Sequence, residues 1–290
     1  MASALMQNYI VASTWSPFFI SVVVILIALP ELSWLDVVTG GLPMALIAVG
    51  VSWLHDRIRY RPRALGDVRS PSVPLEAPHG RNLTCVFATL IVLVIGTVEW
   101  SGLSLPVVLG FVGPLFGMFW MALIEGPTVP PWRSAWRVVR RVYGRIEGLR
   151  SEALAFTASS IVGVGFAVGF PMDAITPFAG QGGWIIFGLI FAILGLGFLG
   201  IHPLVSVIVI SEAVPPTTLG MPVQVVGLSL LGVWGLTTLV SPVSGTTLIM
   251  ARFVPASSYT IAWRWSPPYT ILAAVAIGLF VYAVWRMELY

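Results

Sequence analysis

Long apolar runs separated by short polar segments dominate the chain. They lie at 8–29, 43–55, 83–100, 103–125, 151–170, 183–199, 203–214, 222–253 and 268–286. A helix needs about 20 predominantly apolar residues to cross the hydrocarbon core of a bilayer. The pattern therefore predicts an all-α integral membrane protein built as a polytopic helical bundle.

One apolar run contains its own turn. Gly200-Ile201-His202-Pro203 divides the stretch 183–214, and a glycine and a proline bracket that turn. The second arm, 203–214, is too short to cross a bilayer alone. We therefore predict a re-entrant hairpin that enters and leaves on one side, a structure tolerated at membrane depth only where protein or water surrounds it.

The run 222–253 is too long for one straight helix. It would extend about 50 Å, against a hydrocarbon core of about 30 Å. We predict a broken helix, with the break at Ser241-Pro242-Val243-Ser244-Gly245. The segments 30–42 and 255–267 mix aromatic and polar residues, so we expect both to be surface-lying connectors.

Several serines and prolines recur at one fixed offset. Ser16 and Ser241, Pro17 and Pro242, Pro30 and Pro255, Ser33 and Ser258, and Pro43 and Pro268 each lie 225 positions apart. This recurrence predicts two copies of one membrane unit. We expect 1–64 to be the end of the first copy, 65–82 a cytoplasmic linker and 83–290 the second copy.

Composition agrees with the bilayer and excludes several functions. Of the 290 residues, 57% are hydrophobic and 9% charged, and the mean hydropathy is +0.94. A single cysteine, Cys85, and three histidines give no reason to expect a disulfide or a metal cluster. The net charge of +3 comes from loop arginines, so we expect no nucleic-acid partner.

The arginines predict the orientation. They form two clusters, in 57–81 and in 133–150, which two apolar segments separate, so both can be cytoplasmic. The N-terminus is then also cytoplasmic, and we expect a multi-pass protein of the inner cell membrane. Following the chain, the segment after Pro43 runs inward and the segment after Pro268 runs outward. The two copies are therefore predicted to form an inverted-topology repeat, which points to alternating-access transport.

The candidate site lies where X-Pro pairs interrupt the helices. Each pair can begin a half-helix whose free N–H groups attract an anion, while unwound carbonyls nearby can hold Na⁺. The candidate residues for substrate and ion binding are Ser16, Pro17, Gly200, His202, Pro203, Ser241, Pro242, Ser244, Gly245 and Thr246. The hydroxyls have an ordinary alternative as helix caps or bridges. His202 either takes part in proton coupling or substrate binding, or holds its turn as a neutral histidine.

The order of these elements resembles the C-terminal repeat of the ion transporter superfamily, whose members include divalent-anion/sodium symporters, citrate transporters and large membrane subunits of tripartite transporters. The resemblance covers about 83–286 as a whole repeat, and 8–55 is similar to the end of the preceding one. It implies a homodimer formed through the scaffold helices.

Together these patterns predict a secondary active transporter for a small anion such as a carboxylate, coupled to Na⁺ or H⁺, with no other cofactor. The alternative is a truncated or non-transporting membrane subunit that another chain completes, in which case Met1 is an internal methionine of a longer protein. An enzyme is not expected, because the sequence has no HExxH motif and no intramembrane pair of aspartates.

Overall fold

The structure is a computed structural model. It describes residues 2–59, 77–125, 130–144, 182–213 and 216–290, together with a few positions between 154 and 169. The described residues form helices and turns, without strands. The chain divides into two compact units, Met1–Arg61 with Ala155–Tyr290 and Pro62–Leu154.

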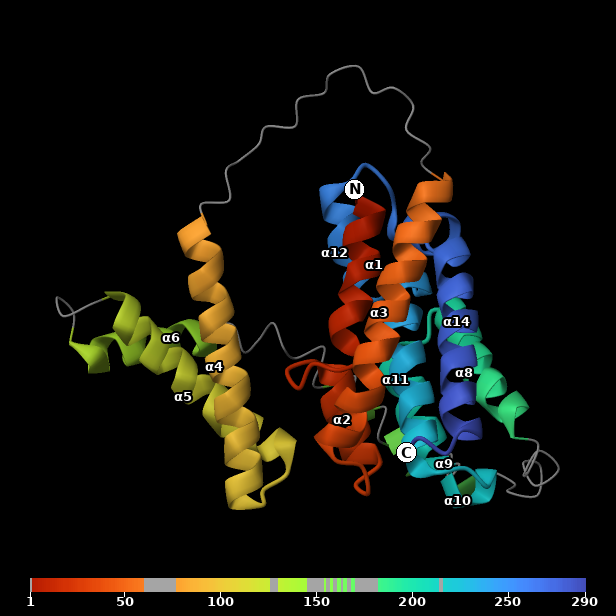
Figure 1. Cartoon of the computed structure of the whole chain (residues 1–290). Helices are drawn as coiled ribbons and strands as arrows, with labels where there is room; N and C mark the ends of the chain where they lie inside the picture. The colour runs from red at the N-terminus through yellow and green to blue at the C-terminus, as the bar shows by residue number, and fades with distance from the viewer. Residues whose placement is uncertain are drawn as a thin grey trace. The chain divides into compact units, whose positions relative to one another are not determined.

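The helices of the first unit begin with α1 (Ala2–Ser13), α2 (Ile20–Ala28) and α3 (Trp34–Arg59). After the second unit, the chain returns as α8 (Gly183–Phe198), α9 (Pro203–Ala213), α10 (Pro216–Leu219), α11 (Val223–Val240) and α12 (Gly245–Phe253). It ends with α13 (Ser258–Thr260), the π-helix η4 (Ile261–Trp265) and α14 (Pro267–Arg286). The second unit contains α4 (Ala77–Ser101), α5 (Leu105–Glu125) and α6 (Pro131–Tyr143) (Figure 1).

Helix α11 is the core of the first unit. It packs against α1, α3, α8 and α14, and its residues from Val225 to Val240 are all buried. A helix that is apolar around its whole circumference suits such a position, in the core of a protein or across a membrane. Trp234 is the largest of its fully buried side chains.

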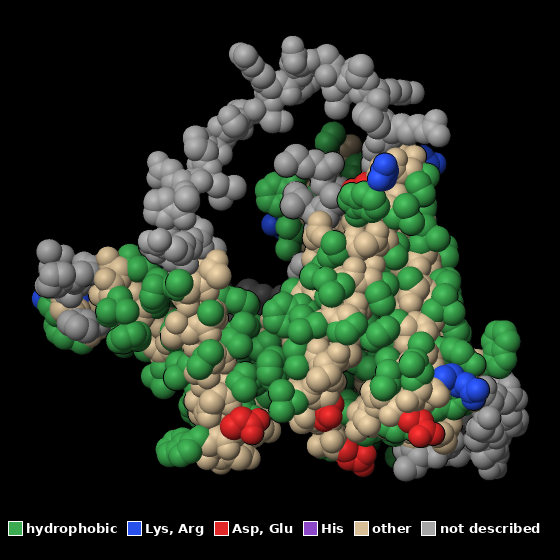
Figure 2. Space-filling view, in the orientation of Figure 1, with side chains coloured by type: hydrophobic (Ala, Val, Ile, Leu, Met, Phe, Trp, Pro, Cys, Tyr) green, Lys and Arg blue, Asp and Glu red, His purple; other side chains and the backbone are tan. Residues whose placement is uncertain are grey.

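Five helices of the described part are long and apolar enough to cross a membrane. They are Trp34–Arg59, Thr84–Ser101, Leu105–Ile124, Pro267–Arg286 and the segment Val223–Phe253, which comprises α11 and α12. Large apolar side chains such as Leu46 and Ile27 are exposed on the first unit, and Figure 2 shows its charged side chains at the two ends, with hydrophobic side chains between them. The prediction of an all-helical protein compatible with multiple membrane crossings is therefore confirmed.

The prediction of a connector at 30–42 was wrong. Helix α3 begins at Trp34 and continues through Pro43. Ser33 and Asp36 form a capping box that starts this helix: the N–H and hydroxyl of Ser33 donate to Asp36 Oδ2 at 2.8 and 2.6 Å, and the Asp36 N–H donates to Ser33 Oγ at 3.2 Å. The helix therefore begins nine residues before Pro43, where the apolar segment was predicted to begin.

The segment 255–267 also differs from the prediction of a surface-lying connector. It contains α13 and η4, and Ile261 and Ala262 of η4 are fully buried. Helix α14 starts at Pro267, next to the predicted start at 268. The segments 30–55 and 255–280, which the 225-residue offset matches, therefore differ. The first contains the start of the single helix α3, and in the second the π-helix η4 precedes α14.

Two sequence predictions fall mainly on residues that the structure does not describe. The apolar segment 151–170 is described only at isolated positions. The linker predicted at 65–82 is described from Ala77, where α4 begins.

Candidate functional site

Both predicted helix breaks are present. The chain leaves α1 after Ser13 and resumes a helix at Ile20, and it leaves α11 after Val240 and resumes a helix at Gly245. Helices α2 and α12, which follow the breaks, each contain nine residues. The breaks therefore divide each apolar run into two helices on either side of a short turn.

The two breaks have the same local structure at the 225-residue offset. In the first, the Phe19 N–H donates to the Ser16 carbonyl at 3.0 Å, and in the second the Ser244 N–H donates to the Ser241 carbonyl at 3.2 Å. Each is a β-turn with proline at its second position, where the fixed φ of proline is favourable. The prediction that Pro17 and Pro242 open the half-helices was wrong, because both lie in these turns, three residues before the helices start.

Each proline also leaves a main-chain carbonyl without its helical N–H donor, and a serine hydroxyl donates to that carbonyl instead. Pro17 has no N–H for the Ser13 carbonyl, to which the Ser21 hydroxyl donates at 2.6 Å. Pro242 has none for the Thr238 carbonyl, to which the Ser244 hydroxyl donates. Such compensation by serine makes a proline break tolerable in a membrane helix.

The two broken helices cross each other within the first unit. A Cβ placed on Gly235 of α11 would lie 2.9 Å from Cγ2 of Ile10 in α1, so the absent side chain lets the helices approach closely. These two residues are themselves 225 positions apart. Figure 1 shows that α1 and α11 run in opposite directions, as do α3 and α14.

Helices α8 and α9 pack together as a hairpin. Helix α8 ends in a Schellman motif, in which Gly200 has a φ of +88° and the Ile201 and Gly200 N–H groups donate to the Leu196 and Gly197 carbonyls. Helix α9 begins with Pro203 at its first position, as predicted. At about 24 and 17 Å, the arms are each shorter than a hydrocarbon core of about 30 Å.

His202 holds this turn. Its Nδ1 accepts a hydrogen bond of 3.2 Å from the Leu204 N–H and so caps α9. The bond leaves the proton of the neutral ring on Nε2. The geometry thus gives His202 the turn-holding role that was one of its two interpretations.

The hairpin lies against the second break. Gly197, three residues before the tip, packs on α11 so closely that a Cβ there would collide with Cγ2 of Thr237. The Thr237 carbonyl accepts the N–H of Ser241, the first residue of the break. The other arm, α9, packs against both α2 and α11. The hairpin therefore contacts a half-helix of each broken segment.

The hydroxyls at the second break have different roles. Ser244 caps α12 by accepting the Thr247 N–H at 3.2 Å, and the Thr247 hydroxyl donates to the Ser241 carbonyl at 2.8 Å. By contrast, the hydroxyl oxygens of Ser241 and Ser206 are buried without a hydrogen-bond partner in the described part of the chain. Buried polar atoms usually have a partner, so these two hydroxyls are the candidates for contact with a bound solute.

The other predicted residues are placed differently. Ser16, Pro17 and Pro242 are buried at their breaks, whereas Gly245 is exposed and Thr246 half-buried at the start of α12. A hydrogen bond joins the first break to α3: the Thr14 hydroxyl donates to the Gly41 carbonyl at 3.0 Å.

Five residues around the breaks and the hairpin were not predicted from the sequence: Gly41, Gly197, Ser206, Ser21 and Thr237. The two glycines give a weak sequence signal of their role, since glycine in an apolar helix often marks close packing. The two serines and the threonine give no such signal, because their roles follow only from the geometry of the breaks.

The serines and prolines of the two breaks are buried, whereas Val243 of the second break is exposed. Two surface pockets of the first unit lie elsewhere, one beside Trp184 and Tyr282, between α8 and α14, and another beside Asp36 and Gln224, on α3 and α11. The arrangement can offer a solute the uncapped N-terminus of α2, the turn carbonyls and the Ser241 and Ser206 hydroxyls. Among the described residues, no group of histidine, cysteine or carboxylate side chains could hold a metal ion.

Comparison with protein-family models, with curated proteins and with solved structures found no match. A function must therefore be inferred from the geometry of the breaks and the hairpin.

Proposed function

We propose that the protein is a secondary active membrane transporter that moves a small anion, such as a carboxylate, by alternating access, with Na⁺ or H⁺ as the coupling ion. The observation that carries the proposal is the matched pair of proline breaks. They have the same turn, in each a serine hydroxyl donates to the carbonyl that the proline leaves unpaired, and they lie on helices that run in opposite directions and contact each other. We interpret them as the two halves of an inverted-topology repeat.

The proposed substrate class follows from the half-helices. Helix N-termini bind anions because their first N–H groups and the helix dipole point toward the ligand. Helix α2 starts without a side-chain cap, and the Val22 N–H donates to the Phe19 carbonyl, so the N–H groups of Ile20 and Ser21 are the ones we propose for contact with an anion. No arginine lies between Ile10 and Leu54 in the first half, so an anion near the first break would depend on these N–H groups, on hydroxyls and on a bound cation.

The hairpin is the proposed gate. We infer that it is re-entrant, with its tip near the middle of the bilayer, because its arms are short and Gly197 packs on α11 one turn before the second break. Movement of α8 and α9 relative to α2 and α11 would expose the Ser206 and Ser241 hydroxyls. We further propose a homodimer in the inner cell membrane with a cytoplasmic N-terminus.

Uptake by the full chain in proteoliposomes tests the proposal. Carbon-14-labelled succinate, malate and citrate are supplied outside, under an inward gradient of Na⁺ or of protons, with protein-free liposomes as the control. We expect at least one carboxylate to accumulate above its outside concentration in the presence of a gradient. Uptake equal to that of protein-free liposomes for every carboxylate and both gradients would overturn the proposal.

A further inference from the structure

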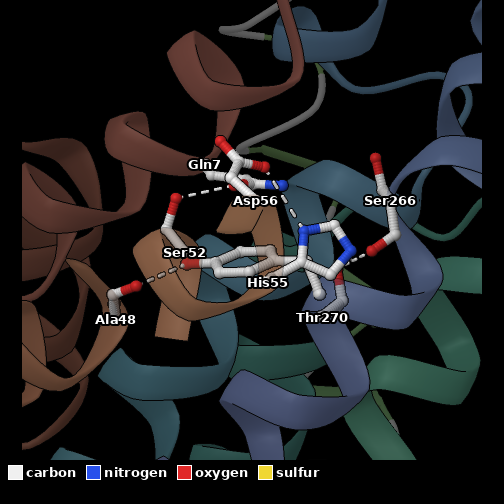
Figure 3. A network of polar contacts seen from close by, with 8 residues as sticks. Gln7, Ala48, Ser52, His55, Asp56, Ser266 and Thr270 are labelled. Atoms are coloured by element: carbon white, nitrogen blue, oxygen red, sulfur yellow. Dashed lines mark hydrogen bonds and ion pairs between the residues drawn. The ribbon is translucent and has the colours of Figure 1, made fainter. Parts of the chain in front are cut away.

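A second group of polar side chains lies away from the breaks, around His55 near the end of α3 (Figure 3). The His55 side chain is 6% exposed, and neither ring nitrogen has a hydrogen-bond partner in the described part of the chain. Oδ1 of Asp56 also lacks one and lies 3.5 Å from His55 Nδ1. Three orphaned polar atoms are therefore concentrated in two adjacent residues.

The neighbouring polar groups are already paired with other partners. Ser52 donates its hydroxyl proton to Gln7 Oε1 at 2.6 Å, and the Tyr269 hydroxyl donates to the Ala48 carbonyl at 3.3 Å. The Tyr269 ring meets the His55 ring edge-on, with 6.1 Å between their centroids. The imidazole is thus enclosed by α1, α3 and α14, but in the described part of the chain none of these helices gives its ring nitrogens a hydrogen-bond partner.

The first turn of α14 adds a local irregularity. Thr270 donates to the Ser266 carbonyl at 2.9 Å, and Ser266 donates to the Ile261 carbonyl at 3.0 Å, at the junction with the π-helix η4. Single π-turns are frequent at functional sites, because they leave room for a helix to shift.

A proton is the ligand that fits these orphaned atoms. Burial of an unpaired imidazole nitrogen costs free energy, and a protonated ring would place a donor and a positive charge next to the orphaned carboxylate oxygen of Asp56. The Asp56 side chain is 31% exposed, so it connects the buried ring with the surface. Imidazole is the side chain that changes charge near neutral pH, and ionisable groups inside membrane proteins often relay protons.

Among the residues that the structure describes, few charged groups surround the ring. The titratable groups that face it are Asp56 from its own helix and Tyr269 from α14, while α1 contributes the uncharged amide of Gln7. Arg57, Arg59 and Arg264 lie on α3 and η4 and are exposed. The Asp56 carboxylate is therefore the nearest charged partner for a protonated His55.

We propose that His55, paired with Asp56, binds and releases the coupling proton of transport. The inference rests on the proposed transport function and names H⁺, rather than Na⁺, as its driving ion. The ring lies where α3 of the first half meets α14 of the second half, so a change in its charge alters the contact between helices that run in opposite directions. Proton binding would thereby favour one of the two arrangements of the halves.

Two transport assays on the same proteoliposomes test the coupling. The His55→Gln variant is compared with wild type and with His79→Gln, a control in which the exchanged histidine lies on α4 of the other unit. We expect His55→Gln to lose accumulation of a labelled carboxylate driven by a proton gradient and to keep exchange of labelled for unlabelled carboxylate. Gradient-driven accumulation equal to wild type, or accumulation in wild type that requires Na⁺ and ignores the proton gradient, would overturn the inference.

A measurement independent of transport separates this inference from the proposed function. The full chain, labelled with ¹⁵N-histidine and reconstituted in nanodiscs, gives ring signals that the His55→Gln, His79→Gln and His202→Gln variants assign. We expect the His55 signals to differ between samples prepared at different pH, as the ring binds and releases a proton. His55 signals that do not change with pH would overturn the proton site. If wild type neither exchanges nor accumulates any carboxylate while the ring still titrates, the transport proposal fails, and with it the assignment of the bound proton as a coupling ion.

Discussion

The Ser21 hydroxyl donates a hydrogen bond of 2.6 Å to the main-chain carbonyl of Ser13, the carbonyl that Pro17 leaves without a helical partner. Both residues are fully buried. The second break repeats this arrangement with Ser244, Thr238 and Pro242. A serine positioned to satisfy the freed carbonyl is thus a structural element of each break.

Replacement of Ser21 by alanine should therefore destabilise the protein. The Ser13 carbonyl would be buried without a partner, which costs about 1–3 kcal/mol. The control is Ser229→Ala in α11, where the serine is also buried and its hydroxyl donates to the Val225 carbonyl. That carbonyl keeps its main-chain hydrogen bond within the helix when the hydroxyl is removed. The free energies of unfolding, measured by SDS titration in mixed micelles, should fall further for Ser21→Ala. Equal losses in the two variants would contradict this role.

Gly41 should tolerate no side chain. A Cβ there would collide with the Thr14 carbonyl at the first break, which is main chain and cannot rotate away. Gly50, on the same helix, has open space around it. We expect Gly41→Ala to lower the midpoint of thermal unfolding, and Gly50→Ala to leave it unchanged or raise it, since alanine favours a helix by up to about 1 kcal/mol over glycine. Similar midpoints for the two variants would show that α3 does not approach the break so closely.

Replacement of Ser241 by alanine should lower carboxylate uptake without destabilising the protein. The Ser241 hydroxyl is buried without a partner, so its removal should leave the free energy of unfolding unchanged or slightly increased. If the hydroxyl contacts the solute, carboxylate uptake should fall by about tenfold, the equivalent of one hydrogen bond of about 1.4 kcal/mol. Ser229→Ala again serves as the control, with unchanged uptake. Wild-type uptake by Ser241→Ala would remove this serine from the site.

The sequence predicted the positions of the breaks and of the hairpin because proline and glycine act locally. Pro17, Pro242 and Pro203 each mark their element within a few residues. The start of α3 was missed because the capping box of Ser33 and Asp36 outweighs the signal of Pro43.

The tertiary part of the candidate site could not be predicted. The contact of Gly197 with Thr237 joins residues 40 positions apart on separate helices, and no periodicity in the sequence encodes it. His55 was overlooked for a related reason. It stands next to Asp56 and Arg57 at the end of an apolar run, where a solvated side chain is expected, and only the packing of α1 and α14 buries it.

If the two copies of the proposed repeat lie in the membrane in opposite orientations, the ends of α3 and α14 face opposite sides of the bilayer, and labelling of single cysteines distinguishes the sides. In a Cys85→Ser background, cysteine is introduced at Ile58, near the end of α3, or at Met287, directly after α14, both of which are exposed. Right-side-out vesicles are treated with a membrane-impermeant maleimide before and after permeabilisation. We expect Met287→Cys to be labelled in intact vesicles and Ile58→Cys only after permeabilisation. Labelling of both positions from the same side would contradict it.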